Sequence, residues 1–255
     1  MATTRVYIDS TVSATRSLGQ ITFPITALST VIPDMILQWD VDATGAASLS
    51  RNRVGSPMTV VGSPAISGYS VALNESNYID SGIPMQNYNA SDLTFVSISK
   101  NPGGQFNIVG VLQVAAPQRS RSHLYTTATN LGARWLNSSG TALVATLGAT
   151  PLAAASNGVD GITAVARSYI NNGTGSIGLR IDFPRTGANA SVPGSAVAPT
   201  TITGNIRIGS SIDAATTVTG SVYAVLVFNR AITATEMATI YSAYKKHYAD
   251  VGVLI

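Results

Sequence analysis

The last part of the chain, residues 221–252, constrains the fold most, because it reads as a buried strand followed directly by an amphipathic helix. Residues 222–228 form an apolar run of strand length, and a helix is predicted to begin at Thr233. Thr233 and Glu236 have the spacing of a capping box, in which each side chain accepts a hydrogen bond from the backbone N–H of the other residue. A helix that starts this soon after a strand is expected to pack back onto the sheet.

The predicted helix has one apolar face. Its large residues recur at helical spacing: Met237, Ile240, Tyr241, Tyr244 and Tyr248. Ile232 precedes the cap and is placed to contact Met237 as a hydrophobic staple. Gly252 predicts the end of the helix.

The rest of the chain from residue 35 consists of short β-patterned runs separated by turn residues, with no other periodicity of helix length. A length of 255 residues suits one large sandwich. Residues 101–105 predict a hairpin turn, and residues 186–203, rich in Ala, Pro, Ser and Gly, predict a loop. The predicted fold class is all-β, an antiparallel β-sandwich with an N-terminal extended arm and a C-terminal α-helix.

The arm is assigned to residues 1–34 and the sandwich with its helix to residues 35–255. Two short strands are expected in the arm, at residues 5–9 and 21–28, and Pro24 marks the second as an edge strand. The arm has too few apolar residues to form a core of its own. It is therefore predicted to join neighbouring copies of the chain or other proteins of an assembly.

Composition excludes several classes of function. Charged residues make up 11% of the chain and the net charge is +3, without a long run of Lys or Arg, so nucleic acid is not an expected partner. There is no cysteine, which excludes disulfides, thiolate metal sites and cysteine nucleophiles. Residues 1–30 show neither a signal peptide nor a membrane span, because Arg5, Asp9 and Arg16 interrupt every apolar stretch, and no membrane partner is expected.

Five segments in this order resemble the concanavalin A-like (LamG/pentraxin-type) jelly roll, particularly the versions found in bacteriophage virion and tail proteins. The matching segments are residues 37–43, 78–84, 92–96, 206–209 and 220–236, of which the last is the strongest. The resemblance covers roughly residues 35–252 and implies a jelly-roll sandwich located in the virion. It does not assign a function, because such folds occur in lectins, carbohydrate-binding modules, glycanases and architectural domains.

No catalytic residue is predicted. The chain has two Glu, of which Glu236 is accounted for by the helix cap and Glu75 has no acidic neighbour nearby. Asp40 and Asp42 would share one face of a strand, where they would serve as an acid pair, as calcium ligands or as structural residues at the strand end. Because Trp39 and Val41 would place the other face in the core, the structural role is favoured; no cofactor is expected, and a metal site stays open.

Sugar binding would require an exposed aromatic ring with amide groups around it. Two sets of residues are predicted as a carbohydrate site: Tyr88 with Asn87 and Asn89, and Trp135 with Arg134 and Asn137. Tyr169 with Asn171 and Asn172 forms a third, less favoured set. For each set the alternative is a ring half-buried at a strand end beside an Asn-rich turn.

These observations predict a non-enzymatic structural component of a virus particle, a capsid decoration or a tail or fibre protein. Its partners would be other virion proteins, further copies of the same chain and host-surface glycan. A soluble lectin or carbohydrate-binding module is the first alternative, and a glycan hydrolase is the second.

Overall fold

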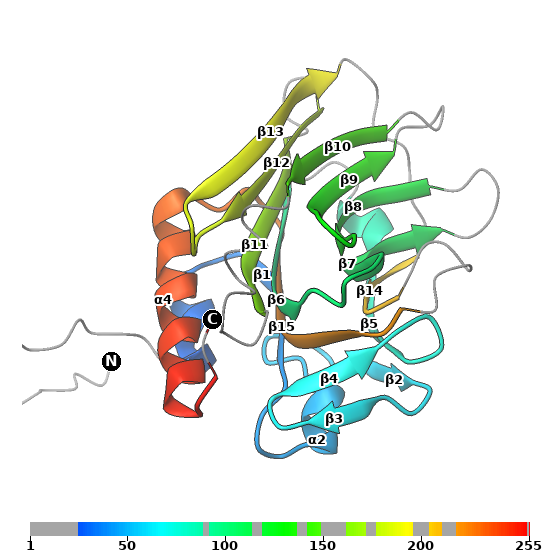
Figure 1. Ribbon diagram of the computed structural model, residues 1–255, viewed down its shortest axis with the longest axis vertical. Helices are drawn as coiled ribbons and strands as arrows, with labels where there is room; N and C mark the ends of the chain where they lie inside the picture. Colours follow the sequence, from blue (N-terminus) through cyan, green and yellow to red (C-terminus); the bar gives the residue numbers. More distant parts are fainter. Residues whose placement is uncertain are drawn as a thin grey trace, which may run out of the picture.

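The computed structural model describes residues 25–88, 92–113, 119–136, 142–148, 162–171, 177–195, 204–210, 218–253 and 255. They form two antiparallel β-sheets packed face to face, with the C-terminal helix against the outer face of one sheet (Figure 1). The all-β fold class, the antiparallel sheets and the C-terminal helix are thus confirmed. The finer jelly-roll assignment stays a prediction.

The first sheet has eight strands. In spatial order they are β13 (Ala188–Ser195), β12 (Ile177–Phe183), β11 (Ile162–Asn171), β6 (Leu93–Lys100), β15 (Gly220–Phe228), β4 (Ser70–Leu73) and β3 (Ala65–Ser67). The eighth strand, β1 (Met35–Asp40), pairs with the second half of β15, beyond the segment that pairs with β4.

The second sheet has seven strands. In spatial order they are β10 (Ala142–Leu147), β9 (Leu131–Leu136), β8 (Arg119–Thr126), β7 (Phe106–Gln113), β14 (Asn205–Ile208), β5 (Tyr78–Pro84) and β2 (Thr59–Val61). Because β6 lies in one sheet and β7 in the other, the hairpin predicted at residues 101–105 is wrong. This connection crosses between the sheets, so that both strands place apolar side chains in the shared core.

The helical elements are η1 (Ile25–Ala27), α1 (Leu28–Val31), α2 (Ala46–Leu49), η2 (Met85–Tyr88) and α4 (Ala234–Asp250). Among the described helices, none has the length and apolar character needed to cross a membrane. The long helix α4 is the one that the cap and spacing predicted.

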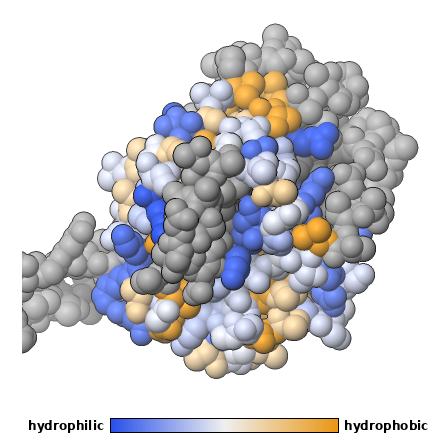
Figure 2. All heavy atoms as spheres, viewed as in Figure 1, coloured by the Kyte–Doolittle hydropathy of each residue, from blue (hydrophilic) through white to orange (hydrophobic). Residues whose placement is uncertain are grey.

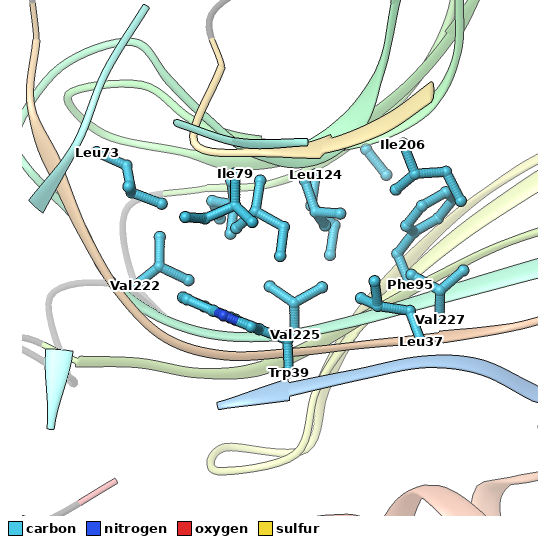
Figure 3. Close-up of a cluster of buried hydrophobic side chains, with 14 of the residues drawn as sticks. Leu37, Trp39, Leu73, Ile79, Phe95, Leu124, Ile206, Val222, Val225 and Val227 are labelled. Carbon is cyan, nitrogen blue, oxygen red and sulfur yellow. The ribbon is translucent and has the colours of Figure 1, made fainter. Parts of the chain in front are cut away.

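The main hydrophobic core lies between the sheets. Figure 3 shows Trp39 and Val225 of the eight-stranded sheet pointing toward Ile79 and Leu124 of the seven-stranded sheet. Trp39 is fully buried, and its indole N–H donates to the carbonyl of Leu49 at 3.0 Å. The polar atom of the largest core side chain is therefore satisfied, as burial requires.

A second core lies between the eight-stranded sheet and α4, and strand β15 contributes to both. Its residues Val222 and Val225 face the main core, whereas Tyr223 and Ala224 both face the helix. Two adjacent residues share a face because the pairing with β6 shifts by one residue at this point, as in a β-bulge. Since both faces of β15 are covered, its sequence reads as a continuous apolar run.

The capping box at the start of α4 is confirmed. The Thr233 hydroxyl accepts from the backbone N–H of Glu236 at 3.2 Å, and a Glu236 carboxylate oxygen accepts from the N–H of Thr233 at 2.7 Å. Arg230 also binds the Glu236 carboxylate with two nitrogen atoms, at 2.6 and 3.0 Å. The ion pair and the cap together hold the helix start to the end of β15.

The end of α4 is a Schellman motif. The N–H of Gly252 donates to the carbonyl of Ala249 at 3.1 Å, and the N–H of Val253 donates to that of Tyr248 at 2.8 Å. Gly252 has a φ of 78°, the left-handed conformation that this motif requires and that glycine adopts without a steric penalty. The predicted stop is therefore confirmed.

The Glu236 carboxylate makes the stability of the fold depend on pH. Its ion pair with Arg230 and its bonds from Thr233 outweigh burial and lower its pKa from 4.5 to about 2. Between about pH 5 and pH 2 the folded state therefore binds fewer protons than the unfolded state, so the free energy of unfolding should fall as the pH drops through this range.

Glu236→Gln keeps a capping acceptor but removes the ion pair. It should lower the free energy of unfolding at neutral pH by roughly 1 kcal/mol and flatten the dependence of stability on pH. Chemical denaturation across this range measures both effects, and an unchanged slope in the variant would contradict this origin.

The described end of the predicted arm is helical and buried. Ile25, Leu28 and Ile32 are each at most 5% exposed and lie in the second core. The short strand predicted at residues 21–28 is therefore wrong from Ile25 onward, where η1 and α1 begin. Helical turns place Leu28 and Ile32, four residues apart, on one side toward α4 and the sheet. Residues 1–24 lie outside the described part of the chain.

Candidate functional site

A groove of about 290 Å³ lies where the hairpin of β12 and β13 meets the first half of α4. In Figure 1 the two strands reach the helix at its upper end, and Figure 2 shows hydrophilic and hydrophobic residues mixed over this region. Its lining comes from two segments: Arg180, Asp182, Phe183, Pro184, Gly187, Ala188 and Asn189 of the hairpin, and Ala234, Met237, Ala238 and Tyr241 of α4. A concave site with an apolar lining and a few polar groups is the usual form of a ligand site.

The polar groups of the groove come from neighbouring positions of the hairpin. Asp182 and Asn189 face each other in the register of β12 and β13. Arg180 lies two residues before Asp182, on the same face of β12, and its Nε and Nη2 atoms both lie 2.8 Å from Asp182 Oδ1. The groove therefore offers a guanidinium, a carboxylate and a carboxamide, which can donate to and accept from hydroxyl groups.

The apolar part of the groove comes mainly from α4. Met237 is buried, and Tyr241 is half-buried one helical turn later. Burial raises the pKa of Tyr241, although nearby Arg185 opposes this, so the phenol stays neutral at ordinary pH. The ammonium of Lys245 lies 5.6 Å from the centre of the Tyr241 ring, a cation–π contact that helps to hold the ring.

Sequence analysis missed this groove because it assigned residues 186–203 to a loop. That prediction is wrong for residues 188–195, which form β13. Among the described strands β13 is at the edge of its sheet, where Pro193 and Gly194 are tolerated because no described strand pairs with its outer side. The one available signal was the turn chemistry of Pro184 and Gly187, at the two ends of the four residues between β12 and β13.

The two predicted carbohydrate sets lie on different elements, and the structure describes only part of each. Tyr88 ends η2, is half-buried and packs against the main core, while Asn87 beside it is exposed. The element that carries Tyr88, η2, directly follows β5. Trp135 lies in β9, four strands away from β5 in the same sheet, a separation of roughly 19 Å between the two strands at the usual strand spacing. The side chain of Trp135, and the residues Asn89 and Asn137, lie outside the described part of the structure.

The third set is not described either. Tyr169 and Asn171 belong to β11, but their side chains and residue 172 lie outside the described part. The assignment of a carbohydrate site to any of the three sets therefore stays a prediction, and none of these residues lines the groove.

Asp40 and Asp42 form an ion cluster with two arginines. Arg53 Nη2 donates to Asp40 Oδ2 at 2.7 Å, and Arg51 Nη2 donates to Asp42 Oδ2 at 2.6 Å. Burial by itself raises the pKa of Asp42, but hydrogen bonds from Thr44 and Arg51 outweigh it and lower the pKa to about 2. Both carboxylates are therefore held by arginine, as expected of a structural pair at a strand end.

Sequence analysis also predicted that Trp39 and Val41 face the core, and in the structure both lie in the main core. Within the described ranges, no group of three or more His, Asp or Glu side chains is arranged to hold a metal ion.

The fold and the groove define an antiparallel β-sandwich with a ligand-sized site at one end of a covering helix. No protein-family model and no curated protein sequence matches the chain. Solved structures with a similar fold include the receptor-binding domain of botulinum neurotoxin D, with a TM-score of 0.56 and 13% identity over 83% of this chain and 53% of that one. The binding domain of botulinum neurotoxin DC in complex with rat synaptotagmin II has a TM-score of 0.57 and 9% identity over 82% of this chain and 52% of the other.

A Trypanosoma rangeli sialidase mutant displaying trans-sialidase activity is also similar, with a TM-score of 0.53 and 12% identity over 83% of this chain and 33% of the enzyme. The chain thus spans about half the length of the neurotoxin domains. At these identities the likeness shows the β-sandwich fold alone.

Proposed function

We propose that this chain is a non-enzymatic component of a virus particle that binds a glycan on the host surface through the groove beside α4. The observation that carries the proposal is the composition of the groove. Tyr241 offers an aromatic ring, and the hairpin offers a carboxylate, a guanidinium and a carboxamide. A sugar presents an apolar face to a ring and hydroxyl groups to such a polar rim, so both halves of the groove would be used.

Among its described residues, the groove has no pair of carboxyl groups of the kind that most glycosidases use. Glycosidases generally use two carboxyl groups, about 5 Å apart in retaining enzymes and farther apart in inverting ones. Asp182 is the one carboxylate among the described residues that line the groove, and it is paired with Arg180. The close pair elsewhere, Asp40 and Asp42, is held by Arg51 and Arg53. We therefore expect binding without cleavage.

The location in a virion rests on the resemblance of residues 35–252 to phage jelly-roll domains and on a composition that has no cysteine and is rich in small residues. The similar solved structures include receptor-binding domains, and a binding role on this fold is in keeping with them. A soluble lectin would use the same groove. An electron map of the purified virus particle separates the two, because a virion component would be present in the map and a soluble lectin would be absent from it.

A glycan array with the wild-type chain, followed by titration of the best ligand, tests the site. Tyr241→Ala should weaken binding at least tenfold, equivalent to about 1.4 kcal/mol, whereas Tyr241→Phe keeps the ring and should bind nearly normally. Asp182→Asn should also weaken binding, because it removes the charged acceptor and disturbs Arg180. Unchanged thermal melts show that the variants are folded.

Tyr88→Ala is the matched control, since it removes a tyrosine that lies outside the groove. Loss of binding in Tyr88→Ala but not in Tyr241→Ala would move the site to the predicted set of Tyr88 with Asn87 and Asn89. Release of shorter glycans from the bound ligand would contradict the non-enzymatic function.

A further inference from the structure

The outer face of the seven-stranded sheet carries two arginines and two tyrosines, away from the groove. Arg207 lies between Ile206 and Ile208, and Arg134 follows Ala133; these three apolar neighbours belong to the main core. Because side chains alternate along a strand, both arginines lie on the opposite, outer face. The same alternation places Tyr78 and Tyr125 there, each half-buried beside a core residue.

Arg207 is held in place on this face. Its guanidinium lies 4.9 Å from the centre of the Tyr78 ring, and its Nε is 3.5 Å from Asp80 Oδ2. Asn205 donates to the other oxygen of Asp80 at 2.9 Å. The Arg207 side chain is still 29% exposed, so a positioned guanidinium remains accessible beside a carboxylate and an amide.

Arg134 lies three strands farther along, roughly 14 Å away at the usual strand spacing. Its buried Nε has no hydrogen-bond partner within the described structure. Tyr125 lies close enough for the positive charge of Arg134 to oppose the rise that burial causes in the tyrosine pKa. A second cation therefore lies on the same face.

The ring of Tyr125 covers a glycine on the neighbouring strand. Tyr125 is opposite Gly132 in the register of β8 and β9, and a Cβ at residue 132 would overlap the tyrosine ring. The ring therefore lies along the sheet and not upright from it.

We propose that this face is a second binding site, for an acidic polysaccharide that runs across the strands from Arg207 to Arg134. The two guanidinium groups would bind carboxylate or sulfate groups, and Tyr125 would stack against a sugar ring. Asp80 and Asn205 would accept from or donate to hydroxyl groups. This site and its ligand are independent of the groove beside α4.

A polysaccharide suits the face better than a nucleic acid. Nucleic acid binding depends on neutralising many phosphates, and the described outer face has two arginines with Asp80 directly beside one of them. A carboxylate repels a phosphate chain but accepts hydrogen bonds from sugar hydroxyls. The mixture of cation, carboxylate, amide and flat ring therefore selects a ligand that carries both acids and hydroxyls.

Binding assays with the full chain test the proposal. The acidic ligands are heparin and polygalacturonate, dextran is the neutral control, and single-stranded DNA is the control for a charged polymer of another class. One or both acidic polysaccharides should bind, and more weakly at high salt, whereas dextran should not bind. Arg134→Gln and Arg207→Gln should each weaken binding about tenfold. Thr146→Glu, at an exposed position opposite Gly132, adds a repelling charge without touching either arginine and should also weaken it.

Lys246→Gln is the matched control, because it removes one exposed positive charge from α4, on the other side of the molecule. An equal loss in Lys246→Gln, unchanged binding in both arginine variants, or DNA binding as tight as that of the acidic polysaccharide would each overturn the proposal. Tyr241→Ala should leave acidic polysaccharide binding intact, which distinguishes this site from the groove.

Discussion

Replacing Arg53 with methionine is expected to lower the free energy of unfolding by about 3–5 kcal/mol, the usual effect of leaving one partner of a buried ion pair alone. The Asp40 side chain is fully buried, and Arg53 binds both of its oxygen atoms. The hydrogen bonds with Asp40 outweigh burial and raise the pKa of Arg53, so the guanidinium stays charged at every ordinary pH. Arg51, 3.7 Å from Asp40, is too distant to replace it fully. Denaturant unfolding of the variant measures the loss.

The double variant Asp40→Asn with Arg53→Met is the control for this result. It removes both charges together and should recover a large part of the stability, because no uncompensated charge stays buried. Asp42→Asn should have a smaller effect, since the Asp42 side chain is 22% exposed. If Arg53→Met is as stable as the wild type, Asp40 is not held by this arginine and its assignment as a structural residue is wrong.

Leu28→Ala and Ile32→Ala are each expected to lower the free energy of unfolding by about 2–5 kcal/mol. Both side chains are essentially fully buried, against α4 and the outer face of the eight-stranded sheet. Each substitution would leave a cavity between these layers that the surrounding elements cannot fill. The effect should appear in the same cooperative transition as the unfolding of the sandwich.

Val31→Ala is the matched control, because Val31 is the last residue of α1, directly before Ile32, but is 39% exposed. It should change stability by no more than about 0.5 kcal/mol. Equal effects at Val31 and Ile32 would contradict the packing of this segment. The predicted role of the N-terminal arm in assembly is best tested by a deletion that ends before Ile25, since a deletion through residue 34 also removes these core residues.

The strand and helix at the C-terminus could be predicted from sequence because the interactions that define them are local. The bonds of the capping box join residues three apart, and those of the Schellman motif join residues at most five apart. The continuous apolar run of β15 likewise shows that both of its faces are covered. Patterns of this kind depend on backbone geometry, which neighbouring residues are sufficient to specify.

The groove could not be predicted because its two halves are far apart in the chain. Asn189 of β13 and Tyr241 of α4 meet only after the hairpin and the helix have packed on the same sheet. The edge strand that carries Asn189 is poor in β-branched residues, so its composition indicates a loop; pairing with β12 overrides that preference.

The sequence by itself therefore determined the all-β class, the limits of the final helix and the caps at its two ends, because each depends on contacts within a few residues. Only the tertiary structure decided which strands pair, that residues 101–105 cross between sheets, that Asp40 meets Arg53, and that Arg134 and Arg207 share a face. These arrangements depend on burying two sheets and a helix against one another. The free energy gained by this burial comes from contacts between distant segments, so no single segment encodes it.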